Sequence, residues 1–412
     1  MKTYKLVDIY GKDLVDFQKK RYEKAIENFK ALYGNIPFRI FSAPGRTEVG
    51  GNHTDHNHGK VLAAGVSLDV IAIVGTCDNN AIQIKSEGFP EDIVDISNLE
   101  VVKTDINSSA SLIRGVADGF FKNGYSIGGF KAYTTSNVLK GSGLSSSAAF
   151  EVLVGTILNY LYNNAEVSPV KIAQIAQYAE NVHFGKPSGL MDQMASSVGS
   201  FITIDFADTE NPIVNSVSFD FSKVGYNLCI VDTKGNHADL TPEYASIPTE
   251  MKSVAGCFQK NYLREITKDQ LLENIVEVRQ KCGDRAVLRA LHFFDDNQRV
   301  EREFLALSEG RFDDFLTEVN NSGNSSYKYL QNIYAPSAPH EQGLSIGLYN
   351  AQSILDGEGA CRVHGGGFAG TIQAFVPNSK LDKFKTEMDR IFGEDSCHVL
   401  SIRPVGGAEI SL

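Results

Sequence analysis

A loop rich in glycine and serine runs directly into a stretch of apolar residues, and this junction constrains the fold more than any other part of the sequence. It reads Lys140-Gly-Ser-Gly-Leu-Ser-Ser-Ser-Ala-Ala-Phe150. Gly141 and Gly143 allow backbone conformations that residues with a Cβ atom resist. From Phe150 to Leu161, apolar residues recur at helical spacing, which predicts a helix with one buried face.

The predicted helix begins near Ser145, Ser146 and Ser147, where hydroxyl groups can cap a helix and the first backbone N–H groups have no partner. A loop that directs N–H groups and a helix dipole toward one point is typical of an anion site, and phosphate is the usual anion. A flexible connection followed by a core helix would give the same pattern. The loop is not a Walker A loop, because no Lys-Ser or Lys-Thr follows the glycines at the required spacing.

The composition is that of an ordinary globular protein of 412 residues, long enough for two or three domains. A net charge of −11 argues against nucleic acid and anionic membranes as partners. The chain begins without an apolar secretory segment, and no run is long enough to span a bilayer. Its six scattered cysteines indicate reduced thiols. We therefore expect a cytoplasmic protein that binds neither nucleic acid nor membrane. We also expect a monomer, although these features do not determine the oligomeric state.

Helices and strands are mixed without regular alternation, which predicts an α+β fold. Helices are expected at 14–32, after the serine loop, at 168–185, shortly after Pro187, and at 381–392. Strands are expected at 61–77, 81–85, 200–206, 228–232, 361–364, 371–376 and 399–403. A composition shift near 207–212 predicts two domains, 1–207 and 208–412.

Residues 37–59 combine turn formers with charged and imidazole side chains, which indicates a functional loop. Within it, His53, Asp55, His56 and His58 could hold zinc or the two metals of a hydrolase. However, their order differs from the His-x-His-x-Asp-His pattern of di-zinc hydrolases. The same residue types hydrogen-bond a polyhydroxylated ligand, and we favour this interpretation.

Three charged residues are further candidates. Asp192 follows a Pro-Ser-Gly turn at a predicted helix start, where the helix dipole keeps a carboxylate ionised; a simple helix cap is the alternative. Glu180 and Ser147 could together hold Mg²⁺, which prefers few protein oxygens plus phosphate and water, or Glu180 could lie on a solvated helix face. Arg46 could bind phosphate or carboxylate, or be an ordinary surface residue.

Three motifs in order resemble the GHMP kinases and, within them, the galactokinases. Residues 45–59, Gly-Arg-Thr-Glu-Val-Gly-Gly-Asn-His-Thr-Asp-His-Asn-His-Gly, are similar to the galactokinase signature Gly-Arg-x-Asn-x-x-Gly-Glu-His-Thr-Asp-Tyr-Asn-x-Gly. Residues 141–149 resemble the family's phosphate loop, and Gly365-Gly-Gly-Phe-Ala-Gly370 resembles its third motif. Between the last two, Gly189-Leu-Met-Asp-Gln193 resembles the stretch that holds the catalytic Asp. The matches extend from about residue 40 to 376.

The resemblance implies phosphorylation of a sugar at its anomeric hydroxyl, with ATP as co-substrate and Mg²⁺ as cofactor. It also implies a cleft between a ribosomal-protein-S5-like N-terminal domain and a ferredoxin-like C-terminal domain. By position, Arg46 and Asp192 would be catalytic, and Ser147 and Glu180 would hold Mg²⁺. The remaining residues that it implies are, for the sugar, Asn52, His53, Asp55, Gly189 and Tyr244, and for ATP, Gly141, Ser142, Gly143, Leu144, Ser145, Ser146, Ser147 and Ala148.

Three departures from the family pattern bear on the substrates. Asn52 replaces a Glu that, in the family, resembles a contact to the O6 end of the sugar. Losing its negative charge removes repulsion toward a C6 carboxylate, so galacturonate becomes an alternative to galactose. N-acetylgalactosamine is a further alternative substrate. Leu139 replaces a Pro before the phosphate loop, and 109–114 lack the aromatic residues of the family's adenine site, which leaves ATP or GTP open. A sugar sensor without turnover is a further alternative, but the serine loop is full length and Asp192 is present.

Overall fold

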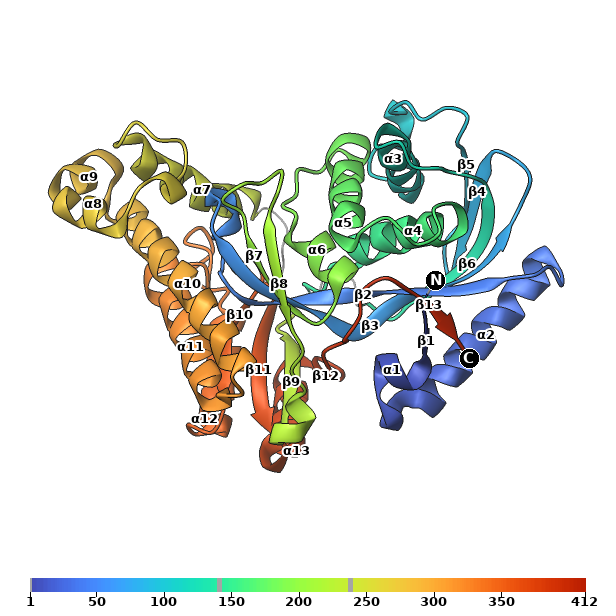
Figure 1. Cartoon of the computed structure of the whole chain (residues 1–412). Coiled ribbons are helices and arrows are strands. Elements are labelled where there is room, and N and C mark those ends of the chain that lie inside the picture. The colour runs from blue at the N-terminus through green and yellow to red at the C-terminus, as the bar shows by residue number, and fades with distance from the viewer. Residues whose placement is uncertain (1, 139–142, 236–239) are drawn as a thin grey trace.

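The computed structural model describes residues 2–138, 143–235 and 240–412, and in this part of the chain the strands form one nine-stranded and one four-stranded sheet. Figure 1 shows helices α8 to α12 on one side of the molecule, helices α1 to α5 on the other, and strands β9 to β12 between them. Within the described ranges, no helix is both long enough and apolar enough to cross a membrane.

The larger sheet is built around β3, a strand of 17 residues. Its order is β1-β13-β2-β3-β6-β4-β5, and β7 and β8 continue from the first part of β3. The strands are β1 (Thr3–Lys5), β2 (Arg39–Gly50), β3 (Lys60–Thr76), β4 (Ala81–Ser86), β5 (Glu91–Asp95), β6 (Phe130–Ser136), β7 (Phe201–Asp205), β8 (Ile213–Val217) and β13 (Ala408–Ser411). β3 pairs with β2 along most of the length of β2, and the first part of the galactokinase-like signature, residues 45–59, lies in β2. The pairing with β3 therefore positions the start of the signature.

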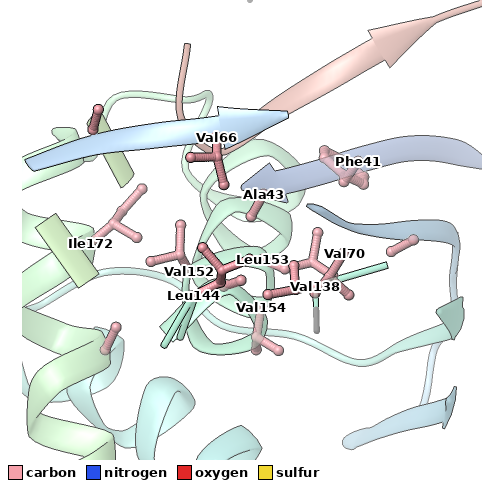
Figure 2. Close-up of a cluster of buried hydrophobic side chains, with 14 of the residues drawn as sticks. Phe41, Ala43, Val66, Val70, Val138, Leu144, Val152, Leu153, Val154 and Ile172 are labelled. Carbon is pink, nitrogen blue, oxygen red and sulfur yellow. The ribbon is translucent and has the colours of Figure 1, made fainter. Parts of the chain in front are cut away.

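Both faces of this sheet are covered, because side chains of β3 alternate between two apolar clusters. Ile71 and Ile73 pack with Phe29 of α2 on one face. Val70 and Ala72 belong to the main cluster on the other face, which includes the apolar residues of α4. Figure 2 shows Val70 beside Leu153, with Phe41 and Ala43 of β2 nearby. The helices of this half are α1 (Leu6–Tyr10), α2 (Val15–Tyr33), α3 (Ser109–Lys122), α4 (Ser146–Tyr162), α5 (Pro169–Tyr178) and α6 (Met191–Val198).

The smaller sheet has the β-α-β-β-α-β connection of a ferredoxin-like domain. Its spatial order is β10-β11-β9-β12, and all of its pairs are antiparallel. The strands are β9 (Tyr226–Asp232), β10 (Ala360–His364), β11 (Thr371–Pro377) and β12 (Cys397–Leu400). The helices are α7 (Thr241–Gly256), α8 (Lys268–Glu273), α9 (Ile275–Cys282), α10 (Asp284–Ser308), α11 (Phe312–Ser325), α12 (Gly343–Leu355) and α13 (Leu381–Phe392). The predicted α+β, two-domain fold is therefore confirmed.

A chain of aromatic rings joins the two sheets through one continuous core. Phe201 of β7 lies 5.5 Å from Phe221 between ring centroids, and Phe221 lies 5.2 Å from Phe375 of β11. Phe315 of α11 packs on Phe375 at 5.1 Å. These rings belong to the same buried cluster as apolar residues of β2 and α4. The two halves are therefore joined by a shared apolar core and not only by the connecting chain.

The observed elements differ from expectation where residues far apart in sequence pair. Residues 37–59 were expected as a loop, but β2 occupies most of that segment, with register shifts between Pro44 and Arg46 and between Glu48 and Gly50. Its glycines and proline therefore lie at or beside irregularities of a strand. The sheet also passes the predicted boundary at 207, because β8 pairs with β7 and the C-terminal β13 pairs with β2. The last predicted strand, 399–403, is β12 and ends at Leu400.

Asp69 joins the N-terminal helices, the larger sheet and the C-terminal segment. Its fully buried carboxylate accepts hydrogen bonds from Tyr10 and Ser42, from Arg21 at 2.5 Å and from Arg403 at 2.9 Å. Burial alone raises the pKa of a carboxyl, but the charges of Arg21 and Arg403 outweigh it and hold the pKa of Asp69 below its ordinary value. Asp69 is therefore an ionised anchor for two guanidinium groups.

We expect Asp69→Asn to lower the free energy of unfolding by roughly 3 kcal/mol or more, because it leaves two buried or partly buried guanidinium groups without their carboxylate. Chemical denaturation measures the loss. The matched control is Asp314→Asn, which removes the exposed partner of Arg311 and is expected to leave stability unchanged. Equal losses in the two variants would contradict the anchoring role of Asp69.

Candidate active site

The start of α4 presents open backbone N–H groups beside the serine loop. Gly143 has a φ of +71°, and Ser145 occupies the N-cap position with a φ of +52°. Contrary to expectation, the Ser145 hydroxyl does not cap the helix but donates to Asp192. The first N–H groups of α4 consequently lack a side-chain cap, which suits an incoming anion. Gly141 and Ser142 lie outside the described residues, and the side chains of Leu144 and Ala148 are buried in the core, so only their backbone can contribute.

Arg46 and Asp192 form a bidentate ion pair next to this loop. Arg46 donates from Nε to Oδ1 at 2.7 Å and from Nη2 to Oδ2 at 2.8 Å, while its third nitrogen donates to the carbonyl of Gly143. The side chain of Arg46 is 9% exposed, whereas that of Asp192 is 31% exposed. Partial burial raises the pKa of a carboxyl, but the charge of Arg46 outweighs it and lowers the pKa of Asp192, which is therefore ionised.

Glu180 and Ser147 lie together on the other side of the α4 start. Ser147 Oγ is 3.2 Å from Glu180 Oε1, and Lys186 Nζ reaches the same oxygen at 3.0 Å. Gln193 binds Glu180 Oε2 at 2.8 Å and also Glu151 at 3.1 Å. Burial, with the nearby charge of Glu180, raises the pKa of Glu151 well above its ordinary value. One hydroxyl and one carboxyl group are hard oxygen donors of the kind that Mg²⁺ prefers beside phosphate and water.

The third glycine motif, residues 365–370, contacts the part of the signature that follows β2. His53, with a φ of +59°, places Nε2 at 2.9 Å from the carbonyl oxygen of Gly366. Its Nδ1 is buried without a hydrogen-bond partner. The Tyr244 hydroxyl donates to the Gly367 carbonyl at 2.9 Å. The signature, the glycine motif and α7 thus meet, although they are distant in sequence.

Asp55 and Gly189 line one pocket, whose volume is about 480 Å³. A Cβ atom at Gly189 would lie 2.8 Å from Asp55 Oδ2, so a larger residue there would displace this carboxylate. His56, His58, Lys252 and Tyr262 are among the other residues that line the pocket.

The histidines of the signature do not converge on a metal. His58 stacks on Tyr262 with ring centroids 3.7 Å apart, while His53 faces Gly366. Among the described residues, no group of three or more His, Cys, Asp or Glu side chains could hold a metal ion. The geometry accordingly gives no support to the zinc interpretation.

Asn52 lies behind the wall of the site rather than on it. Its side chain has no exposed surface. The amide nitrogen donates to Glu48 and to the carbonyl of Gly365, both at 2.8 Å, and the amide oxygen accepts from Asn332 at 2.8 Å and from Ser326 at 3.3 Å. All of its amide hydrogen bonds are made within the protein. The expected direct contact of Asn52 with a sugar is therefore not what this geometry offers.

Sequence reasoning missed several residues of the site. Lys186 and Gln193, which bind Glu180, carried no motif of their own, although Gln193 directly follows Asp192. His364, at the end of β10, lies 3.1 Å from Thr47 and 2.9 Å from Thr371. Only its position before the third glycine motif could have marked it.

Comparison with known proteins finds two matched regions, which contain Arg46, Ser147, Glu180 and Asp192. Residues 111–200 match the family described as GHMP kinases N terminal domain, and residues 27–76 match the galactokinase galactose-binding signature. The chain is 28% identical to the galactokinase of Streptomyces coelicolor, covering 93% of this chain and 96% of the relative. It is also 28% identical to that of Lactobacillus helveticus, with coverages of 90% and 94%.

Solved structures share the fold. Lactococcus lactis galactokinase complexed with galactose superposes with a TM-score of 0.79 at 23% identity, covering 94% of this chain and 99% of that one. Methanococcus jannaschii mevalonate kinase superposes with a TM-score of 0.61 at 13% identity, covering 89% and 98%.

Two buried histidines make the folded protein sensitive to acid. Burial lowers the pKa of His53 to about 4 and that of His364 to about 3. In the unfolded chain both take up a proton below about pH 6.5. Since the folded protein binds these protons only at lower pH, stability falls as pH drops from about 6.5 toward 4, by about 1.4 kcal/mol per pH unit for each histidine.

We expect His364→Gln to make this dependence shallower by about 1.4 kcal/mol per pH unit between pH 5.5 and 4. Denaturation of both proteins at a series of pH values measures the slope. An unchanged slope would show that His364 is protonated in the folded protein.

Proposed function

Because this chain is a member of the GHMP kinases and belongs to their galactokinase family, we propose that it transfers the γ-phosphoryl group of ATP to the anomeric hydroxyl of galactose. The observation that carries the proposal is the Arg46–Asp192 pair. It lies where the end of the serine loop, the signature strand and α6 meet. A group that must touch both a phosphate and a sugar hydroxyl belongs at such a junction.

The phosphate side of the site provides charge stabilisation. Phosphoryl transfer depends mostly on positioning and on stabilising the charge of the transferring group. The N–H groups at the start of α4 would bind phosphate oxygens, and the guanidinium of Arg46 would offset charge on the γ-phosphoryl group. Ser147 and Glu180 would hold Mg²⁺, which when bound neutralises phosphate charge. Lys186, now on Glu180, is 59% exposed and can move toward phosphate without burying a charge.

Asp192 orients the sugar hydroxyl. A carboxylate whose pKa lies below its ordinary value is a weak base toward a hydroxyl, so proton transfer is expected late in the step. Its partly exposed side chain can accept a hydrogen bond from the substrate, and Arg46 and Ser145 fix its direction. The role of Asp192 is thus to place the oxygen in line with the phosphorus atom.

On the sugar side, His53, Asp55, Gly189 and Tyr244 would bind or shape the space for the hydroxyl groups. The argument for galacturonate depended on Asn52 facing the C6 end of the sugar. Because Asn52 is buried and fully hydrogen-bonded, that argument loses its support, and galactose is the substrate that we propose. A cytoplasmic location and a monomeric state remain predictions.

A coupled assay of ADP release tests the proposal directly. The panel is galactose, N-acetylgalactosamine, galacturonate and arabinose, each with ATP and Mg²⁺. We expect the highest kcat/KM with galactose. Calorimetric binding of a sugar without ADP release would instead identify a sensor, and faster turnover of galacturonate would overturn the substrate assignment.

We expect Asp192→Asn to lower kcat by roughly 10²-fold or more while sugar binding stays nearly intact, because the amide keeps the shape but loses the charge that orients and accepts from the hydroxyl. Single-turnover kinetics and calorimetry measure the two effects separately. Asp314→Asn, which removes a carboxylate from an exposed ion pair with Arg311, serves as the control. Near-normal turnover in Asp192→Asn would refute the assignment.

A further inference from the structure

Two residues four apart on the signature segment, Glu48 and Asn52, contact each other inside the protein. The Asn52 amide donates to Glu48 Oε1 at 2.8 Å, and Arg362 reaches the same oxygen at 3.2 Å. Glu48 is 6% exposed, and Asn52 and Arg362 have no exposed surface. Burial raises the pKa of Glu48, while the charge of Arg362 and the hydrogen bond from Asn52 oppose that rise. Asn52 therefore stabilises the ionised form of its neighbour.

The pair exchanges the residue types of the signature that this segment resembles. That pattern has Asn at the position of Glu48 and Glu at the position of Asn52, whereas here the carboxylate and the amide have changed places. The structure brings both positions into direct hydrogen-bond contact. Two changes that compensate each other across one hydrogen bond explain this chain better than an isolated loss of a sugar-binding Glu.

We propose that Glu48 and Asn52 form a matched carboxylate–amide pair that positions the sugar-binding end of β2, and that neither residue touches the sugar. The identity of the sugar in this inference rests on the proposed function, whereas the coupling between the two residues does not. Asn52 donates to the Gly365 carbonyl, and the adjacent His53 contacts the Gly366 carbonyl oxygen. The pair therefore sets the distance between the signature and the third glycine motif.

The contacts around the pair give it a fixed position. The Asn52 backbone N–H donates to Asp296 at 2.9 Å, and its carbonyl accepts from His292 at 2.9 Å, both on α10. Arg362, on β10, donates to the carbonyl of Val49 as well as to Glu48. The smaller domain thus supports the wall of the site from behind, and an error in the pair would displace His53.

Isosteric exchanges test the pair without changing its volume. In Asn52→Asp a carboxylate replaces the amide, faces Glu48 and the Gly365 carbonyl, and loses both donated hydrogen bonds. We expect the KM for galactose to rise by about 10-fold or more, because buried acceptors without donors are unfavourable and would displace the adjacent His53. The KM for ATP is expected to stay within about 2-fold, because the pair lies on the sugar side of the site. Glu48→Gln keeps an acceptor for Asn52 and is expected to have a smaller effect.

The double variant Glu48→Gln/Asn52→Asp restores an amide facing a carboxylate. It is expected to recover at least about half of the loss in Tm seen in Asn52→Asp, and part of the loss in galactose affinity, because contacting residues couple. Asn159→Asp is the matched control, since Asn159 is a buried amide on α4 that binds only the backbone of Val167. It is expected to lower Tm while the KM for galactose stays within about 2-fold.

An unchanged galactose KM and Tm in Asn52→Asp, or a double variant no better than Asn52→Asp, would overturn the inference. If the Asn52→Asp protein is insoluble, the solubility of the double variant decides the question. A soluble double variant supports the pair, and an insoluble double variant contradicts it. The Tm measurements need no substrate, whereas failure of the wild-type protein to phosphorylate galactose would refute the proposed function alone. The two outcomes are therefore distinguishable.

Discussion

The bidentate contact between Arg46 and Asp192 is the interaction on which the rest of the site depends. It joins β2 to the start of α6, and through Gly143 and Ser145 it joins both to the serine loop. A guanidinium on a side chain that is 9% exposed requires a paired carboxylate, since an uncompensated buried charge is costly. In the function that we propose, the same pair would contact a phosphoryl group on one side and a hydroxyl on the other.

Rigidity around this pair comes from contacts that cross between the two domains. Aromatic rings from β7, α11 and β11 form one core. Arg403, near the C-terminus, donates a hydrogen bond to Asp69 of β3 in the larger sheet. The smaller domain also supplies His292, Asp296 and Arg362 behind the signature. Catalysis by positioning needs such support, because a displacement of about 1 Å in the reacting groups can cost two orders of magnitude in rate.

The sequence predicts what local chemistry determines. The helix after the serine loop, the helix expected from residue 168 and the strand expected at 371–376 follow from local patterns, and the structure has them. It does not predict pairings made across hundreds of residues, such as β13 with β2 or Asn52 with Asn332. For the same reason, the local sequence predicts that the Ser145 hydroxyl caps a helix. In the structure the hydroxyl donates instead to Asp192, a carboxylate on another helix.

The central claim is that the reacting hydroxyl lies between Arg46, Asp192 and the end of the serine loop. A crystal structure with galactose, Mg²⁺ and a non-hydrolysable ATP analogue tests this most directly. The account predicts the anomeric oxygen within hydrogen-bond distance of an Asp192 carboxylate oxygen, with the terminal phosphate within reach of Arg46. Galactose bound with its anomeric oxygen away from Asp192, or a triphosphate bound away from the start of α4, would contradict it.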